Sequence, residues 1–343
     1  MDNGLIAHEL RKLFSQEFGI APKELHSQGA VTHLNVGSST GMNPEAFRDN
    51  MDFIDDDISE RTGIETHTVW DKKGADILLI HNAGEILSWP DNPGAYSLLF
   101  NQAGLSWTLS SEAVAYDAVN YGLWYDDAMM GKILMRQMKV AAELGVKRVV
   151  IGECGHSHKA MAVVGDRLLS GKLRIPRVSV LPILRDLVVG GTFKLNPLQN
   201  NFPVTLHDPC NFVRSMGIVQ PQREILKLIA PKFREMTPNG VHNYCCGGGS
   251  GFAIMSSNQF EQWRIAVAGR EKMRQIITAF EGEPAEQEKY LCAPCSNCKG
   301  QFRDMLTYYK AWDRARIHYG GLADLVVNAF PNLPEPFIRW GEG

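Results

Sequence analysis

The sequence predicts an α/β protein made of two similar halves, each built on a short parallel sheet, and three observations support this. Residues 76–80 and 147–151 are short apolar runs with β-branched side chains, which are typical of buried strands. Between them, residues 128–144 place methionine, isoleucine and leucine side chains at helical spacing, and Gly145 can end that helix. The order strand, helix, strand favours parallel pairing, and the second half of the chain repeats it.

The elements of the second half follow the same pattern. Residues 204–207 form a strand candidate that ends at Asp208, and residues 263–280 form a helix candidate with one apolar side. Residues 290–292 lead into a cysteine-containing turn. Residues 322–330 predict a final helix before a proline-rich tail.

Three pairs of segments can be laid over each other between the halves, at similar but unequal separations. They are residues 79–82 with 206–210, 107–111 with 242–246, and 152–157 with 293–298. We interpret these pairs as a degenerate internal duplication, in which the first copy retains a single cysteine, Cys154.

The duplication sets the predicted boundaries. Residues 1–70 are predicted to be a polar, irregular N-terminal segment, with a helix over residues 5–18. Residues 71–195 are predicted to be the cysteine-poor repeat, and residues 196–343 the intact, metal-binding copy. A group of aromatic residues is expected to pack in the core and not to form a substrate cage: Trp107, Tyr116, Tyr121, Trp124 and Tyr125.

Composition narrows the function classes. At 343 residues and 44% hydrophobic content, the chain can bury a sizeable core. A net charge of −3 gives no electrostatic reason to expect a nucleic-acid partner. The N-terminus lacks the charged-then-apolar layout of a signal peptide, and no stretch approaches about eighteen uninterrupted apolar residues. We therefore expect a cytoplasmic protein, with membrane association through partner subunits left open.

The cysteines are the most informative residues. The sequence has seven, of which six lie between Cys210 and Cys298. A secreted disulfide framework would come with a signal peptide and a smaller domain. In a reducing compartment, such a group more often binds metal or carries out redox chemistry.

The spacing of these cysteines defines a candidate site. Cys210 is followed after thirty-four residues by Cys245-Cys246-Gly, and then by the pair Cys295-Ser-Asn-Cys298. Neighbouring side chains on an extended strand point to opposite faces, so adjacent cysteines can meet one centre only where the backbone turns sharply. The glycines that follow Cys246 permit such a turn and offer N–H groups to sulfur. The number of thiols exceeds what a tetrahedral zinc site requires, and their spacing is not that of ferredoxins.

The pattern resembles the CCG domain, the cysteine-rich domain of the B-type subunit of heterodisulfide reductase and its relatives. One intact and one degenerate copy look closest to the DsrK branch, the catalytic subunits of a membrane complex linked to dissimilatory sulfite reduction. The resemblance implies a noncubane [4Fe-4S] cluster held by five cysteines: Cys210, Cys245, Cys246, Cys295 and Cys298. Two departures are a long interval between Cys246 and Cys295, with residues 281–289 as the insertion, and a missing ferredoxin segment.

The resemblance implies an oxidoreductase that reduces or forms a sulfur–sulfur bond. The expected substrate is a heterodisulfide or the trisulfide of a small sulfur-carrier protein of the DsrC type. Electrons are expected from a partner subunit that carries ferredoxin-type clusters or from a membrane cytochrome subunit. One alternative is an electron-transfer subunit of a flavin-dependent 2-hydroxyacid or glycerol-3-phosphate dehydrogenase. Another is a zinc-stabilised scaffold without catalytic activity.

Candidate catalytic residues come from the degenerate copy. Cys154 follows a predicted strand and is either a small buried hydrophobic residue or a thiol that faces the cluster pocket. His156 and His158 beside it could supply protons to a leaving thiolate, although a structural role is the simpler alternative. His207 and His242 flank the cysteines and are expected to hydrogen-bond around the site.

Overall fold

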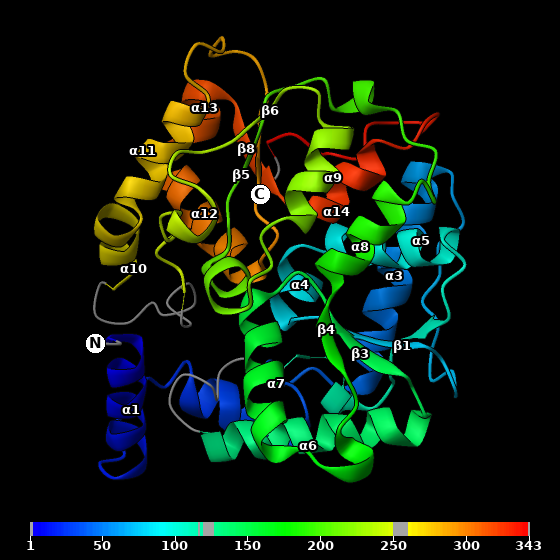
Figure 1. The fold of residues 1–343 in the computed structure, drawn as a ribbon, viewed down its shortest axis with the longest axis vertical. Coiled ribbons are helices and arrows are strands. Elements are labelled where there is room, and N and C mark those ends of the chain that lie inside the picture. Colours follow the sequence, from blue (N-terminus) through cyan, green and yellow to red (C-terminus); the bar gives the residue numbers. More distant parts are fainter. Residues whose placement is uncertain (1–2, 116, 119–126, 250–259, 342–343) are drawn as a thin grey trace.

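The computed structural model describes residues 3–115, 117–118, 127–249 and 260–341. Two four-stranded parallel sheets form the framework, and their strand orders are the same: β2-β1-β3-β4 and β6-β5-β7-β8 (Figure 1). The strands are β1 (Ile77–Ile80), β2 (Trp107–Thr108), β3 (Arg148–Ile151), β4 (Arg177–Ser179), β5 (Val204–Leu206), β6 (Phe233–Arg234), β7 (Lys289–Cys292) and β8 (Ile317–Gly320). The prediction of two α/β halves with short parallel sheets is confirmed.

Helices surround both sheets. The α-helices of the described residues are α1 (Asn3–Gln16), α2 (Thr32–Val36), α3 (Pro44–Thr62), α4 (Ala83–Ser88), α5 (Asp91–Gln102), α6 (Asp127–Leu144), α7 (Gly155–Leu168), α8 (Val180–Val189), α9 (Pro221–Ile229), α10 (Phe260–Trp263), α11 (Arg270–Ala279), α12 (Ser296–Tyr308), α13 (Ala311–Ala315) and α14 (Leu322–Asn328). Shorter π and 3₁₀ turns include η1 (His26–Val31), η6 (Asn211–Ser215), η7 (Gly240–His242) and η10 (Arg264–Ala268). Within this described part, no helix has both the length and the hydrophobicity needed to span a bilayer.

The N-terminal segment is largely helical, so the prediction of an irregular segment up to residue 70 is wrong. The nineteen-residue helix α3 begins after Asn43, whose side chain accepts a hydrogen bond from the backbone of Ala46, and ends at Gly63. Its apolar side chains recur at intervals of four, three and four residues and are buried: Phe47, Met51, Ile54 and Ile58. This stripe packs on α5, so the helix belongs to the first half.

Most other predicted elements are confirmed, with one difference in the second half. The predicted helix over residues 263–280 is interrupted: the π turn η10 leads into Gly269, and α11 begins after it. The extra residue per turn in η10 shifts the following helix relative to α10. Trp107 is buried as expected. The other members of that aromatic group, at positions 116, 121, 124 and 125, lie outside the described residues.

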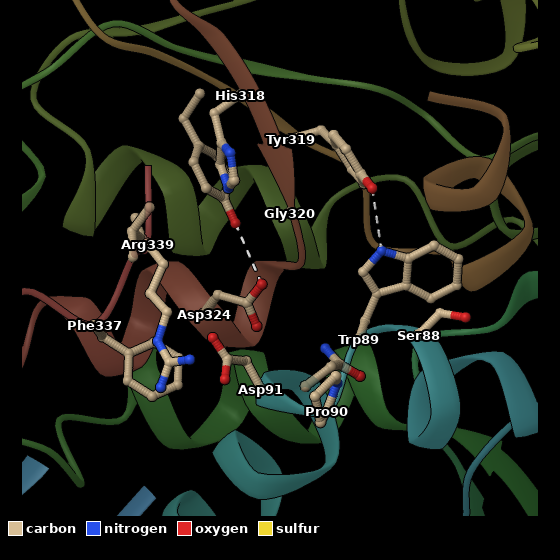
Figure 2. Close-up of a pocket in the computed structure, with 13 residues that line it drawn as sticks. Ser88, Trp89, Pro90, Asp91, His318, Tyr319, Gly320, Asp324, Phe337 and Arg339 are labelled. Atoms are coloured by element: carbon tan, nitrogen blue, oxygen red, sulfur yellow. Dashed lines mark hydrogen bonds between the residues drawn. The ribbon is translucent and has the colours of Figure 1, made fainter. Parts of the chain in front are cut away.

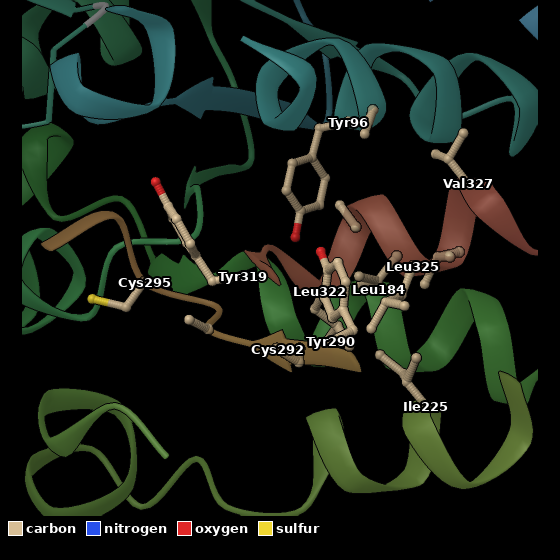
Figure 3. Close-up of a cluster of buried hydrophobic side chains, with 14 of the residues drawn as sticks. Tyr96, Leu184, Ile225, Tyr290, Cys292, Cys295, Tyr319, Leu322, Leu325 and Val327 are labelled. Atoms are coloured by element: carbon tan, nitrogen blue, oxygen red, sulfur yellow. The ribbon is translucent and has the colours of Figure 1, made fainter. Parts of the chain in front are cut away.

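The two halves share one core. On the first sheet, Leu78 and Val149 face α6 and α7, whereas Leu79 and Val150 face α3 and α5. The apolar cluster that contains Leu79 and Val150 continues without a break into α8, α9 and α14 of the rest of the chain. Figure 3 shows Tyr96, Leu184, Ile225 and Leu325 of this shared core. The halves therefore hold a fixed arrangement relative to each other.

The carboxyl ends of the two sheets face each other across the seam between the halves. Ser296, which follows β7, donates its backbone N–H to the carbonyl of Glu153, which follows β3, at 2.8 Å. The Ser296 hydroxyl also donates to Asn82 Oδ1, beyond the end of β1, at 3.2 Å. In parallel sheets, the loops after the strand ends are where ligand sites form. The seam is thus the expected place for a functional site.

Candidate functional site

The candidate ligands come from loops at the carboxyl ends of the second sheet. Cys210 follows β5 and precedes η6, while Cys245 and Cys246 follow η7. Cys295 and Cys298 lie at the start of α12, which follows β7. Three separate loops therefore bring thiols to one edge.

The thiols form one continuous set of contacts. Cys246 Sγ lies 3.5 Å from Cys298 Sγ. Cys245 is in hydrogen-bonding contact with both Cys210 and Cys246, and Cys298 with Cys295. At the far end, Cys295 contacts Cys154 of the first half. All of the predicted ligands are thus brought together, and Cys154 adds a further thiol from a fourth stretch of chain.

Cys292 does not join this set. It is fully buried at the end of β7, and Figure 3 shows it beside Tyr290 in the core, whereas the Cys295 sulfur points away from that group. The pKa of Cys292 is raised well above its ordinary value by burial, with further contributions from Glu153 and Asp324. Cys292 therefore behaves as a small apolar core residue.

One side of the thiol set is open. Cys154, Cys246, Cys295 and Cys298 are at most 3% exposed, whereas Cys210 is partly exposed and Cys245 is exposed. In the described part of the chain, a molecule approaching from solvent meets Cys210 and Cys245 first.

Glycines make the turn after the double cysteine possible. Gly247 has φ +90°, and an added Cβ there would lie 2.9 Å from the carbonyl oxygen of Arg264. The N–H of Gly247 points to Cys245 Sγ at 3.3 Å, and the N–H of Gly248 to Cys246 Sγ at 3.4 Å. Backbone N–H groups aimed at sulfur favour thiolate and sulfide charge.

Two helix N-termini face the set from opposite halves. Cys154 is the N-cap residue of α7, and Cys295 is the N-cap residue of α12. The backbone is arranged in the same way at both N-caps. The Cys154 N–H donates to the Gly152 carbonyl, and the Cys295 N–H donates to the Ala293 carbonyl, each at 2.7 Å. The partial positive charge of each N-terminus favours thiolates there.

The pKa values show where the contacts favour thiolates. The pKa of Cys295 is held well below its ordinary value by hydrogen bonds from Cys154 and Cys298. The pKa of Cys245 is lowered to about 2 by hydrogen bonds from Cys210 and Cys246. Burial raises the pKa of Cys154, one of the donating thiols, well above its ordinary value. Negative charge therefore concentrates at two places in the set.

His207 is the histidine that reaches the thiols most directly. Its Nε2 lies 3.3 Å from Cys298 Sγ, and the ligand atoms of His207, Cys246 and Cys298 all lie within 4.8 Å of one another. Burial lowers the pKa of His207 well below its ordinary value, so the ring is neutral. His242 lies at an exposed position in η7, where its backbone N–H bonds to Asn239.

The two predicted proton donors differ in position. His156 Nδ1 lies 2.9 Å from Asn297 Nδ2, and the ring also contacts Cys295. The His158 ring instead packs against Phe212, and its Nδ1 has no hydrogen-bond partner among the described residues. Burial lowers the pKa of His158 to about 4.

Three further polar residues at the site were not predicted from the sequence. Ser157 donates to Cys154 Sγ at 3.2 Å, and Asn297 Nδ2 lies 3.7 Å from the same sulfur. Ser157 occupies the position in the first half that Cys298 occupies in the second, three residues after the N-cap cysteine. That register was available from the sequence. The third residue, Lys272 on α11, is fully buried, and a lysine within a predicted helix gives no sign of this.

A separate cavity of about 260 Å³ lies nearby on the seam (Figure 2). Its described lining contains no cysteine and includes Trp89, Asp91, His318, Tyr319 and Arg339. Trp89 donates to the Tyr319 hydroxyl at 3.4 Å, as Figure 2 shows, and Lys299 Nζ lies 5.4 Å from the centre of the Trp89 ring. The cavity is therefore distinct from the thiol set.

The residues present fit a polynuclear, sulfur-seeking metal centre. The thiol set offers more ligands than the four that a single tetrahedral ion takes, and none of its cysteines is in a disulfide. The His207 ring and the glycine N–H groups place polar, hydrogen-bonding groups next to the sulfurs, as metal-binding sites usually do around their ligands.

Comparison with known proteins agrees with this donor set. Residues 204–303 match the family described as the cysteine-rich (CCG) domain. The chain carries a CCG domain. The interval includes all of the candidate ligands, so the resemblance inferred from the sequence is confirmed at the level of the domain family. The narrower resemblance to the DsrK branch stays a prediction.

Longer similarities extend beyond the CCG domain. The chain is 25% identical over 317 residues to the Hdr-like menaquinol oxidoreductase iron–sulfur subunit 2 of Archaeoglobus fulgidus, covering 80% of this chain and 54% of that protein. It is 25% identical over 161 residues to a subunit of the dihydromethanophenazine:CoB–CoM heterodisulfide reductase of Methanosarcina barkeri, covering 46% of this chain and 39% of that protein. The chain thus spans about half the length, or less, of the curated relatives it matches. A glutamate racemase structure from Bacillus anthracis overlays with a TM-score of only 0.33 at 12% identity, over 76% of this chain and 79% of that chain, and bears on neither fold nor function.

Proposed function

We propose that the chain is a heterodisulfide reductase-like oxidoreductase that binds an iron–sulfur cluster and reduces or forms a sulfur–sulfur bond. The observation that carries the proposal is the continuous set of thiol contacts from Cys210 to Cys295, drawn from three separate loops. The proposed ligands are Cys210, Cys245, Cys246, Cys295 and Cys298. Five thiolates favour a noncubane [4Fe-4S] cluster over a cubane one, which needs four.

The surroundings of the thiols match the needs of such a group. Bound there, an iron–sulfur cluster would supply electrons one at a time and iron with affinity for a substrate sulfur. The helix N-terminus at Cys295 and the N–H groups of Gly247 and Gly248 would stabilise the thiolates. The exposed side at Cys245 gives a large substrate room to approach.

We assign the substrate-side chemistry to the first half. Cys154 Sγ abuts Cys295 and is held by Ser157 and Asn297, so we propose it as the thiol that faces the substrate sulfur. Asn297 Nδ2 lies 2.9 Å from His156 Nδ1 and orients that ring beside Cys295, so we propose His156 as the proton donor to a leaving thiolate. His158 is neutral at pH 7, because its pKa is about 4, and we propose only a packing role for it.

The substrate and partners are proposed from the relatives. A heterodisulfide, or the trisulfide of a DsrC-type carrier protein, fits a thiol-lined site with an open side. Relatives named as a menaquinol oxidoreductase subunit and a heterodisulfide reductase subunit support an electron-donating partner, either a subunit with ferredoxin-type clusters or a membrane cytochrome. In this proposal, residues 71–195 form the degenerate copy and residues 196–343 the cluster-binding copy.

Electron paramagnetic resonance tests the proposal. Protein purified without air and then oxidised is measured before and after addition of a thiol that mimics half of the substrate. We expect a cluster signal that changes when the thiol is added. If no cluster signal appears although iron fully occupies the protein, the catalytic proposal fails.

A matched pair of variants links that signal to the site. Cys298→Ala removes a thiol from the set, whereas Cys292→Ala removes an equally buried thiol outside it. We expect Cys298→Ala to lose most of its iron and Cys292→Ala to keep the wild-type content. Equal loss from both variants would argue against the proposed ligand set.

A single zinc ion is a second candidate, because His207, Cys246 and Cys298 could hold one. It would leave Cys210 and Cys245 without a role. Metal analysis separates the two: zinc alone favours a scaffold, whereas iron with acid-labile sulfide favours the redox proposal.

A further inference from the structure

Lys272 is a buried cation that has no carboxylate partner in the described part of the chain. It lies on α11 with 0% of its surface exposed. Its Nζ donates to Asn243 Oδ1 at 2.6 Å and to Gln275 Oε1, and lies 3.6 Å from Met236 Sδ. Among the described residues, the ion pairs do not include Lys272. Its hydrogen-bond partners are thus neutral, which leaves the full charge uncompensated.

Three other buried cations in the second half, Arg223, Arg264 and Lys289, have partners of a kind that Lys272 lacks. Arg223 forms a two-pronged pair with Asp208, at 2.7 and 2.5 Å, and Arg264 pairs with Asp304. Lys289 is also almost fully buried, but its Nζ donates to three backbone carbonyls near the chain turns at Pro284 and Ala315. Lys272 lacks both kinds of support, so its burial needs another explanation.

The charges that act on Lys272 come mainly from the thiol set. Cys246, Cys298 and Cys245 all interact electrostatically with it, as does Asp208. The Asp208 charge is already matched by Arg223. The residue that positions Lys272, Asn243, lies two positions before Cys245, so the lysine is tied to the double-cysteine turn. The thiolates are therefore the anions available to compensate Lys272.

We propose that Lys272 is the buried counter-ion of the metal centre and raises its reduction potential. This inference rests on the proposed function, because it requires a cluster held by the thiol set. Several thiolates around one cluster carry net negative charge, and burial makes that charge costly unless a cation lies near. Reduction adds a further electron to the same region. A fixed positive charge stabilises the reduced form more than the oxidised one, since net charge is one of the determinants of cluster potential.

The test is a redox titration of cluster-loaded protein, purified without air and followed by electron paramagnetic resonance. Lys272→Met removes the charge and keeps much of the side-chain volume. Lys289→Met is the matched control, because it deletes an equally buried lysine whose partners are carbonyls away from the thiols. We expect Lys272→Met to shift the midpoint to more negative potential. At the wild-type midpoint, the ratio of reduced to oxidised cluster should fall at least tenfold, which corresponds to about 59 mV for one electron.

The control and a second variant make the outcome decisive. Lys289→Met should keep the wild-type midpoint, even if it lowers thermal stability. If Lys272→Met does not accumulate as folded protein, Lys272→Gln is measured instead, because glutamine keeps a donor for Asn243 without the charge. It should show the same negative shift.

Failure of this inference is distinguishable from failure of the proposed function. A wild-type protein without iron and sulfide overturns both. A loaded wild type with an unchanged midpoint in the Lys272 variants overturns the role of Lys272 and leaves the proposed function standing. A shift of equal size in Lys289→Met would also overturn it, because the effect would then come from general loss of packing.

Discussion

Glu153 joins the two halves next to the candidate site, and its ionisation should leave a measurable trace in stability. It follows β3, is fully buried, and its carboxylate accepts hydrogen bonds from the Tyr96 hydroxyl at 3.0 Å and from the backbone of Leu322 and Ala323 at 3.1 and 3.0 Å. Burial raises the pKa of Glu153 from 4.5 to about 7, against the opposing effect of Lys299. The perturbation is Glu153→Gln, which keeps the shape and an acceptor oxygen but cannot ionise.

The sign of the effect follows from proton linkage. Between about pH 4.5 and pH 7, folded wild-type protein binds more protons at Glu153 than unfolded protein does, so its free energy of unfolding falls as pH rises. The full fall is about 3 kcal/mol for a shift of this size, and about 2 kcal/mol of it lies between pH 5.5 and pH 8. The glutamine variant lacks this fall. Its stability relative to wild type should therefore rise by about 2 kcal/mol over that range.

The assay is thermal unfolding of both proteins, at one scan rate and without air, at several pH values from 5.5 to 8. For a chain of this length, about 2 kcal/mol corresponds to a change of about 3 °C in the difference between the two melting temperatures. We expect that difference to move in favour of Glu153→Gln as pH rises. A difference that stays constant with pH would refute the reasoning, because it would mean that Lys299 or another cation holds Glu153 at an ordinary pKa.

Three further predictions concern packing and the double-cysteine turn. Gly247→Ala places a Cβ 2.9 Å from a backbone carbonyl at φ +90°, so it should lower iron per chain by at least about half. Gly249→Ala should keep its iron, because among the described residues its Cβ would meet nothing closer than 3.8 Å, and metal analysis of both variants checks this. Asp208→Ala removes one two-pronged partner of the buried Arg223 and leaves it only Glu235, so it should cost about 1–3 kcal/mol. The melting temperature should fall by a few degrees, and an unchanged value would contradict this prediction. Gly94→Ala would push a Cβ to within 2.5 Å of an isoleucine on α3 and should cost about 1–3 kcal/mol in denaturant unfolding, with an unchanged midpoint as the contrary result.

The sequence predicted the fold where the hydrophobic pattern was continuous. The runs that became β1, β3 and β5 are apolar along most of their length because helices cover both faces of each sheet, and α6 shows a regular apolar stripe. The helix α3 was missed although its capping residues and apolar spacing were present, because its acidic residues dominate the composition. The edge strands β2 and β6 are only two residues long, too short for a periodic pattern.

The candidate site was predictable in its residues but not in its surroundings. The cysteine spacing and the glycines identified the thiols that the structure brings together. The contact between Cys154 and Cys295 depends on how the two halves face each other, which follows from tertiary packing and not from spacing. The burial of Lys272 depends on the same packing, since a lysine on an amphipathic helix is ordinarily solvated.

Iron and acid-labile sulfide, determined with the visible spectrum on protein purified without air, test the central claim most directly. We predict about four irons and four sulfides per chain, as a [4Fe-4S] cluster contains, and a brown protein with broad absorption. A colourless protein with one zinc ion and neither iron nor sulfide would contradict the account.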